Sequence, residues 1–153
     1  MGPVEEVFSY CGTMAHDIEV EDLLVGSLKF KSGALGLIEA NTTVYPGLFA
    51  RLDIYGKNGT AVIVDDEIEF FATKDGIKIK KAKERMRESG TASPKISYDL
   101  HKRQLEDIVD SILSNRKPRI TGVDGRNTLA VVTALYESCK TGKSVKVNIR
   151  ENS

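Results

Sequence analysis

Short β-forming stretches separated by turn signals occupy the first eighty residues of this chain. The turns are Ser32-Gly33, Lys57-Asn58-Gly59 and Asp75-Gly76, and glycine-containing turns between β-rich runs favour hairpins. Consecutive hairpins pair neighbouring strands in opposite directions, so the pattern predicts an open, predominantly antiparallel (mixed) sheet. Strands are expected at 4–10, 20–30, 34–43, 51–55, 60–64, 67–73, 77–80 and 144–149.

Two helices are expected near the C-terminal end. The first is predicted over residues 98–115, before Pro118, and the second from about Asp124 to Thr141. Gly142 follows at once and suits a left-handed cap. Apolar residues recur at helical spacing in both segments. They are Leu105, Ile108, Val109 and Ile112 in the first helix, and Leu129, Val132, Tyr136 and Cys139 on the expected buried face of the second.

This order of elements indicates an α+β fold with the two helices packed as one layer on one face of the sheet. The opposite face is not cleanly polar, because apolar side chains also fall on the other strand parity. An exposed face of that kind marks an interaction surface. We therefore expect a second subunit or a further domain to cover it. The apolar side chains of this parity are Leu23, Val25, Leu35, Leu37, Tyr55 and Ile63.

The composition narrows the possible partners and compartments. The length of 153 residues suggests one domain. Lys plus Arg equals Asp plus Glu, at 22 each, which argues against a nucleic-acid partner. No apolar run is long enough to span a membrane, and the first residues do not resemble a signal peptide, so a cytoplasmic location is expected. Cys11 and Cys139 could form a bridge, but a chain without an export signal favours free buried thiols.

Known catalytic and cofactor motifs have no match in these 153 residues. The sequence contains no G-x-G-x-x-G, no phosphate-binding loop and no zinc-type Cys/His spacing, so we expect no catalytic residue, cofactor site or metal site in this chain. His16 lies in the acidic stretch HDIEVED. That stretch could be a metal or acid/base cluster. The alternation of a strand would not bring its carboxylates together, which favours a solvated loop that enters a strand.

Two groups of polar residues are candidate binding residues. Asn41, Thr43 and Tyr45 lie at a strand end before a Pro-Gly turn, where clustered donors and acceptors could bind sugar hydroxyls, although ordinary turn chemistry also explains them. His101 lies in the first turn of the first helix, within H-x-x-Q-L. Its imidazole could project toward a pocket, or it could be an ordinary surface histidine.

Several stretches together resemble the C-terminal domain of the glucose–fructose oxidoreductase / inositol dehydrogenase (Gfo/Idh/MocA) family. They are residues 20–60, HKRQLEDIVDSILSNRKP and ALYESCKTGKSVKV, and the resemblance extends over roughly residues 2–147. It implies a fold like the C-terminal domain of dihydrodipicolinate reductase, covering the whole chain (1–153). It also implies an N-terminal Rossmann domain that binds NAD or NADP, a sugar, inositol or similar polyol as substrate, and a homo-oligomer paired through the sheets.

The family's two catalytic motifs, Glu-Lys-Pro and Asp-x-x-x-His, have no match here. Gly2-Pro3-Val4 resembles the turn after the family's catalytic helix, so we expect that the sequence is cut just downstream of that helix and that the chain alone is inactive. The resemblance places Asn41 to Tyr45 toward the active site, and Tyr98 and His101 at the border of the substrate site. Two alternatives stay open: a stand-alone dimerising binding or scaffold domain, and a sugar-binding module without redox function.

Overall fold

The computed structural model describes residues 1–45, 47–65, 67–81 and 98–150. The chain divides into two compact units. The first unit contains residues 1–43 and the described residues from 98 onward, and the second contains the described residues from 44 to 81. The sequence of residues 81–95 is charged and then contains Ser, Gly and Pro, which favours a surface loop, but this segment lies almost entirely outside the described residues.

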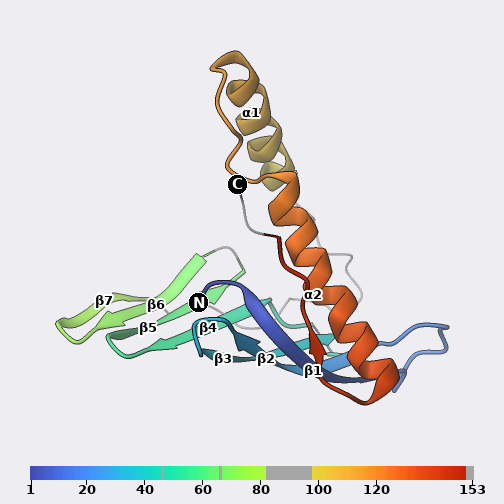
Figure 1. The fold of residues 1–153 in the computed structure, drawn as a ribbon. Helices are drawn as coiled ribbons and strands as arrows, with labels where there is room; N and C mark the ends of the chain where they lie inside the picture. Colours follow the sequence, from blue (N-terminus) through green and yellow to red (C-terminus); the bar gives the residue numbers. More distant parts are fainter. Residues whose placement is uncertain (46, 66, 82–97, 151–153) are drawn as a thin grey trace. The chain divides into compact units, whose positions relative to one another are not determined.

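The first unit contains a four-stranded antiparallel sheet. Its strands are β1 (Val4–Gly12), β2 (Leu23–Phe30), β3 (Leu35–Asn41) and the short β8 (Val145–Lys146). The spatial order is β3-β2-β1-β8 (Figure 1). Ser32 and Gly33 connect β2 to β3 as predicted, and the register pairs Ser27 with Leu37. The last strand thus lies beside the first, although they are far apart in the sequence.

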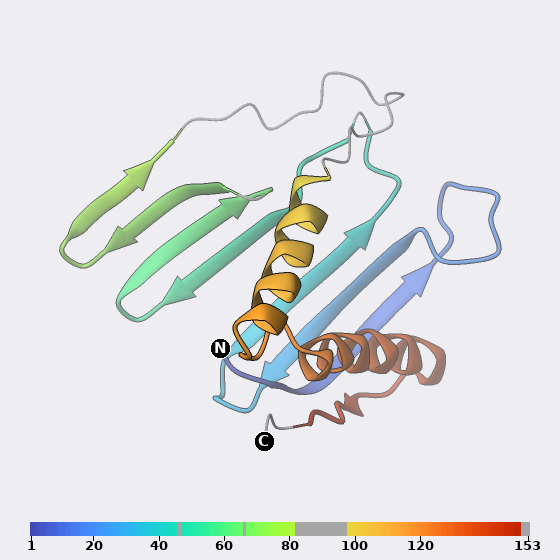
Figure 2. The same cartoon turned by 90° about the horizontal axis from the view of Figure 1, so that it is seen from above.

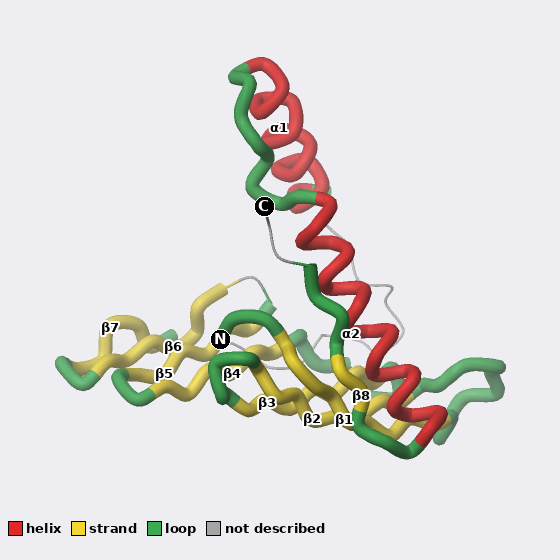
Figure 3. Tube along the Cα trace, viewed as in Figure 1, coloured by secondary structure: helices red, strands yellow, loops and turns green. Residues whose placement is uncertain are grey.

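Helix α2 (Gly122–Thr141) packs along β1 and contacts β8 (Figure 3). Its N-terminus has a capping box between Thr121 and Asp124, and Gly142 ends it with a φ of 64°. Both features agree with the predicted bounds. A methyl group added to Gly26 would lie 3.1 Å from a methyl carbon of Leu135. The absence of a side chain at this position therefore lets α2 approach the sheet closely.

The buried face of α2 differs from the one predicted. Ala134, Leu135 and Ser138 are buried, whereas Leu129 and Val132 are exposed. The sequence pattern selected other large apolar residues, whereas Leu135 and the small residues Ala134 and Ser138 form the side of the helix that touches the sheet. The core of the first unit consists of Val7, Leu24, Ala134 and Leu135.

The second unit is another four-stranded antiparallel sheet, in the order β4-β5-β6-β7 (Figure 2). Its strands are β4 (Arg51–Gly56), β5 (Gly59–Val64), β6 (Glu67–Thr73) and β7 (Gly76–Lys80). The α+β class is therefore confirmed and every hairpin is found where predicted. The strands form two sheets, however, and every recorded pairing is antiparallel. Ile63 consequently belongs to a different sheet from Leu23 and Val25.

Helix α1 (Asp99–Leu113) is amphipathic but leaves its apolar residues exposed. The predicted stripe is present, and Ile112 has 73% of its surface accessible. Arg116 accounts for the shape of the loop after the helix, because its guanidinium donates to Asp107 at 2.9 Å and to Asp110 at 2.6 Å. The exposed stripe differs from the predicted single layer of two helices packed on a sheet.

The two cysteines form a disulfide, so the prediction of free thiols is wrong. Cys11 near the end of β1 and Cys139 near the end of α2 have Cα atoms 5.8 Å apart. The packing of α2 along β1 brings together residues separated by 128 positions. Within the part of the chain that the structure describes, no helix is long and apolar enough to cross a membrane.

Candidate functional site

Tyr98 and His101 lie at the start of α1, as predicted. Tyr98 is the N-cap residue and His101 is the third residue of the helix. Residues three apart in a helix share a face, so the two side chains border one surface. That surface is a groove of about 530 Å3, and its described lining comes from Tyr98 and α1 alone. A groove with one wall requires another surface to enclose a ligand.

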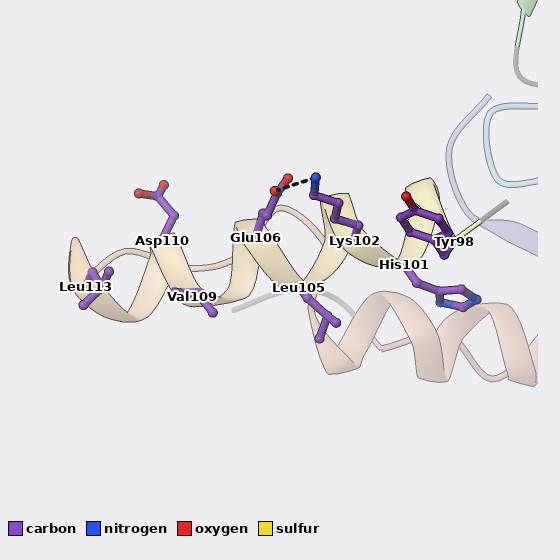
Figure 4. Close-up of a pocket in the computed structure, with 8 residues that line it drawn as sticks. All are labelled: Tyr98, His101, Lys102, Leu105, Glu106, Val109, Asp110 and Leu113. Atoms are coloured by element: carbon purple, nitrogen blue, oxygen red, sulfur yellow. Dashed lines mark ion pairs between the residues drawn. The ribbon is translucent and has the colours of Figure 1, made fainter.

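The groove combines an apolar strip with a polar edge. Figure 4 shows His101 and Leu105 projecting from one side of α1, and Lys102 and Glu106 from the other. The Lys102 ammonium lies 3.9 Å from a carboxylate oxygen of Glu106. Further along, Val109, Asp110 and Leu113 extend the lining. The helix thus offers an imidazole and a phenol at one end of a mainly apolar strip.

Asn41 and Thr43 lie together at the end of β3. The Oδ1 of Asn41 accepts hydrogen bonds from the backbone N–H of Thr43 at 2.8 Å and from its hydroxyl at 2.7 Å. The Nδ2 of Asn41 donates to Glu39 at 3.1 Å. These bonds are the local turn chemistry that the sequence offered as the alternative to sugar binding. They occupy most of the hydrogen-bonding capacity of Asn41.

The structure does not unite the five candidate residues into one site. Tyr45 belongs to the second unit and is 85% exposed. In the described part of the chain, no hydrogen bond joins Asn41 or Thr43 to Tyr98 or His101. The predicted residues therefore fall into a pair at the end of β3 and a pair at the start of α1 in the first unit, and Tyr45 in the second unit.

The acidic stretch around His16 forms a loop built on Asp22. The Asp22 side chain is buried and accepts the backbone N–H groups of Met14 at 2.7 Å, Ala15 at 2.9 Å and His16 at 2.9 Å. The His16 ring nitrogen Nδ1 lies 3.1 Å from the same carboxylate. Burial opposes ionisation of Asp22, but the three N–H groups and His16 together hold its pKa far below the ordinary value.

The carboxylate of Asp22 therefore holds the loop together. The argument from strand alternation, which treated all the acids of this stretch alike, did not predict this role. Asp17 and Glu19 remain exposed, and Glu21 accepts a hydrogen bond from the hydroxyl of Tyr136. That bond raises the pKa of Tyr136. Among the described residues, no cluster of His, Cys, Asp and Glu is arranged to hold a metal ion. The loop, rather than a metal centre, accounts for the acidic stretch.

Comparison with known proteins identifies the class to which the fold belongs. Residues 1–147 match the C-terminal alpha/beta domain of the Gfo/Idh/MocA oxidoreductase family. The chain is a member of this family and represents its C-terminal domain. This agrees with the resemblance found in the sequence.

Individual relatives are more than twice as long as this chain. Myo-inositol 2-dehydrogenase of Thermotoga maritima is 27% identical over 166 aligned residues, which cover 94% of this chain and 43% of that protein. The WlbA dehydrogenase of Bordetella pertussis, solved with NADH and UDP-GlcNAcA, is 27% identical and has a TM-score of 0.72. The match covers 98% of this chain and 40% of the dehydrogenase chain. Levoglucosan dehydrogenase with NADH has the same fold, with a TM-score of 0.77 at 18% identity over 98% of this chain and 46% of its own.

Proposed function

We propose that this chain is the substrate-side and oligomerisation domain of an NAD- or NADP-dependent oxidoreductase that acts on a sugar, inositol or similar polyol. The observation that carries the proposal is the match of residues 1–147 to a C-terminal domain, in a chain that spans 43% of an inositol dehydrogenase. In such an enzyme the nicotinamide accepts the hydride and the protein orients the reacting carbon. Both units, residues 1–153, act as one functional domain, and the protein works in the cytoplasm.

The nucleotide-binding Rossmann domain of the parent enzyme is the partner that α1 requires. The exposed stripe of α1 includes Leu105, Val109 and Ile112, which are costly to leave in water. Because the described residues give the groove a single wall, a second domain that covers the stripe would also close the groove. His101 and Tyr98 would then lie at the rim of an enclosed pocket, where an imidazole and a phenol can hydrogen-bond to polyol hydroxyls.

The hydrogen bonds of Asn41 at the end of β3 leave few of its donors and acceptors free to contact a substrate. The Thr43 hydroxyl donates to Asn41 and keeps acceptor capacity for a substrate hydroxyl. Asn41 acts mainly by fixing Thr43, whereas Tyr45 is exposed and free to contact a ligand. We therefore assign substrate binding to Thr43, Tyr45, Tyr98 and His101, with Asn41 in a supporting position. No residue of this chain carries out proton or hydride transfer.

Self-association through the sheet of the first unit is the second part of the proposal. The face turned away from α2 carries exposed Tyr10, Val25, Leu35 and Leu37, and Leu37 is 89% exposed. We call these four residues the outer face. Two sheets can pack face to face about 10 Å apart, and a two-fold axis makes such a face self-complementary. The alternative function, a stand-alone dimerising scaffold or binding domain, rests on this same face.

Ligand titration of the isolated chain tests the assignment. By calorimetry we expect neither NAD nor NADP to bind, because no glycine-rich turn is present to receive the pyrophosphate. We also expect no turnover of any polyol. Micromolar affinity for a dinucleotide, or turnover that survives repurification, would contradict the proposal. Binding of a polyol in the absence of a nucleotide-binding domain would favour the sugar-binding alternative.

A further inference from the structure

The disulfide between Cys11 and Cys139 joins the end of β1 to the last turn of α2. Cys11 is the penultimate residue of β1, just before the β1–β2 loop (residues 13–22), and Cys139 is in the last turn of α2. Both cysteines are only partly buried. The bond therefore lies outside the fully buried core, and thiol–disulfide exchange requires such access.

The packing of α2 on the sheet does not depend on this bond. The backbone N–H of Ser9 donates to the Ser138 hydroxyl at 3.0 Å, and the Ser9 hydroxyl donates to the carbonyl of Leu135 at 2.6 Å. Both serines are essentially inaccessible to solvent. Together with the core around Val7 and Leu135, these contacts hold α2 as far as Ser138 against β1 whether or not the sulfurs are joined.

The disulfide instead restrains the β1–β2 loop and the end of α2. The disulfide holds Cys11 at the start of this loop, and Tyr136, one turn before Cys139, donates to Glu21 at its end. Figures 1 and 2 show the loop extending beyond the strands that it joins. Its apolar side chains Met14 and Val20 are exposed. The last turns of α2 are therefore bonded to both ends of the β1–β2 loop, by the disulfide at its start and by the Tyr136 hydrogen bond at its end.

We propose that Cys11 and Cys139 form a reversible modification site for a small-molecule thiol of the glutathione type. Reduction frees the loop and the last turn of α2 while the fold persists. A disulfide in a reducing compartment is usually transient or redox-sensing, which agrees with a bond that the core does not need. The role does not use the substrate site, but it rests on the cytoplasmic location given with the proposed function.

The chemistry balances with two thiols of the external reductant. One thiolate attacks a protein sulfur, the sulfur–sulfur bond breaks, and a mixed disulfide forms while the other cysteine leaves as a thiolate and takes a proton. A second external thiolate then attacks the mixed disulfide. The products are the low-molecular-weight disulfide and the second protein thiol. The protein gains two electrons and two protons, and two external thiols are oxidised to one disulfide.

A redox titration of the folded chain with reduced and oxidised glutathione tests the proposal. Alkylation and mass spectrometry measure the thiol content, circular dichroism measures folding, and hydrogen exchange measures local opening. We expect complete, reversible conversion with an unchanged dichroism spectrum. After reduction, amides in residues 12–22 and 139–141 should exchange about tenfold faster or more, as a local opening predicts, while those in residues 25–40 should not change.

A double variant, Cys11→Ser with Cys139→Ser, is the matched control. It should show the exchange pattern of the reduced protein in every glutathione mixture. Three outcomes would overturn the proposal: thiols that never join in the oxidised mixture, a bond that persists in millimolar reduced glutathione until the protein unfolds, or reduction that leaves exchange in the loop unchanged. The last two would make the disulfide a passive cross-link. All three can be read from the wild-type chain even if the double variant folds poorly.

Discussion

Asp22 organises a whole loop through one side chain. It is buried, and its carboxylate accepts three consecutive backbone N–H groups and lies beside the His16 ring. A carboxylate that accepts several N–H groups is stabilised in its charged form. The ordered β1–β2 loop and the ionised form of Asp22 therefore stabilise each other.

The stability of the chain should depend on pH through this residue. Since the folded-state pKa of Asp22 lies below the unfolded value, the folded state gains stability above the unfolded pKa, about 3.9. That gain is lost as the pH falls toward the folded pKa. Urea denaturation at pH 7 and pH 3 should show that Asp22→Asn is less stable than wild type at pH 7 and that the difference narrows at pH 3.

Asp17→Asn is the matched control for this experiment, because Asp17 is an exposed acid in the same loop. Its free energy of unfolding should stay close to the wild-type value at both pH values. An equal loss of stability in the two variants would mean that the general acidity of the loop, and not the buried carboxylate, stabilises it.

Single residues were predicted from the sequence only where local chemistry decides them. Gly142 was placed correctly because a left-handed cap requires its free backbone. The burial of Asp22 was missed, since the acids of HDIEVED look alike until the loop closes around one of them. The spacing of Asp22 from the amides of residues 14–16 depends on the path of the loop, which no periodicity encodes.

At the scale of elements, a buried serine pair joins α2 to β1. Ser138 accepts from the N–H of Ser9 and donates to the carbonyl of Lys143 at 2.7 Å. Ser138→Ala leaves a buried donor and a carbonyl without these partners, so it should cost about 1–3 kcal/mol in the free energy of unfolding. Chemical denaturation measures this loss.

Thr133→Ala is the control on the same helix, because the Thr133 hydroxyl also bonds within α2 but is exposed. Its effect should stay within about 0.5 kcal/mol. If Ser138→Ala were as mild as Thr133→Ala, the serine pair would not contribute to the docking of α2.

The bounds of the helices followed from the sequence, but the packed face of α2 did not. Caps and breakers such as Pro118 and Gly142 are local signals. The packed face depends on how closely a helix approaches the sheet, and here Gly26, Ala134 and Ser138 permit a close approach. A search for large apolar residues cannot detect such a contact. The exposed stripe of α1, in contrast, was correctly placed by helical spacing.

For the whole molecule, we predict that the isolated chain self-associates through the outer face. A stable interface buries roughly 800 Å2 per subunit. Light scattering at tens of micromolar protein should give more than the monomer mass. Val25→Lys should shift the protein to monomer, because it places a charge in the middle of the face, opposite Tyr10 in the register.

Thr133→Lys introduces the same charge on an exposed position of α2 and should leave the mass unchanged. A monomeric wild type at these concentrations would refute the interface. So would a folded Val25→Lys protein with the mass of the wild type.

The division of the strands into two sheets was not predictable from the strand pattern. Each hairpin is specified by its own turn, such as Lys57-Asn58-Gly59, and this is why all of them appear in the structure. Whether β3 and β4 belong to one sheet depends on the segment between them, whose turn residues specify no pairing. The same limit applies to the candidate site, because residues at a strand end and at a helix start share no local signal that would unite them.

The central claim is that this chain supplies the substrate side of an oxidoreductase, and steady-state kinetics of His101→Ala tests it most directly. The protein to use is the two-domain form of the proposed parent enzyme, with a nucleotide-binding domain ahead of this chain. A helix residue outside the apolar stripe should change folding stability by less than about 1 kcal/mol. Arg103→Gln, at an exposed position of the same helix outside the groove lining, is the control. We expect His101→Ala to raise KM or lower kcat for the polyol at least tenfold, a loss of about 1.4 kcal/mol, with the KM for the dinucleotide unchanged. Unchanged polyol kinetics, or an effect confined to the dinucleotide, would contradict the account.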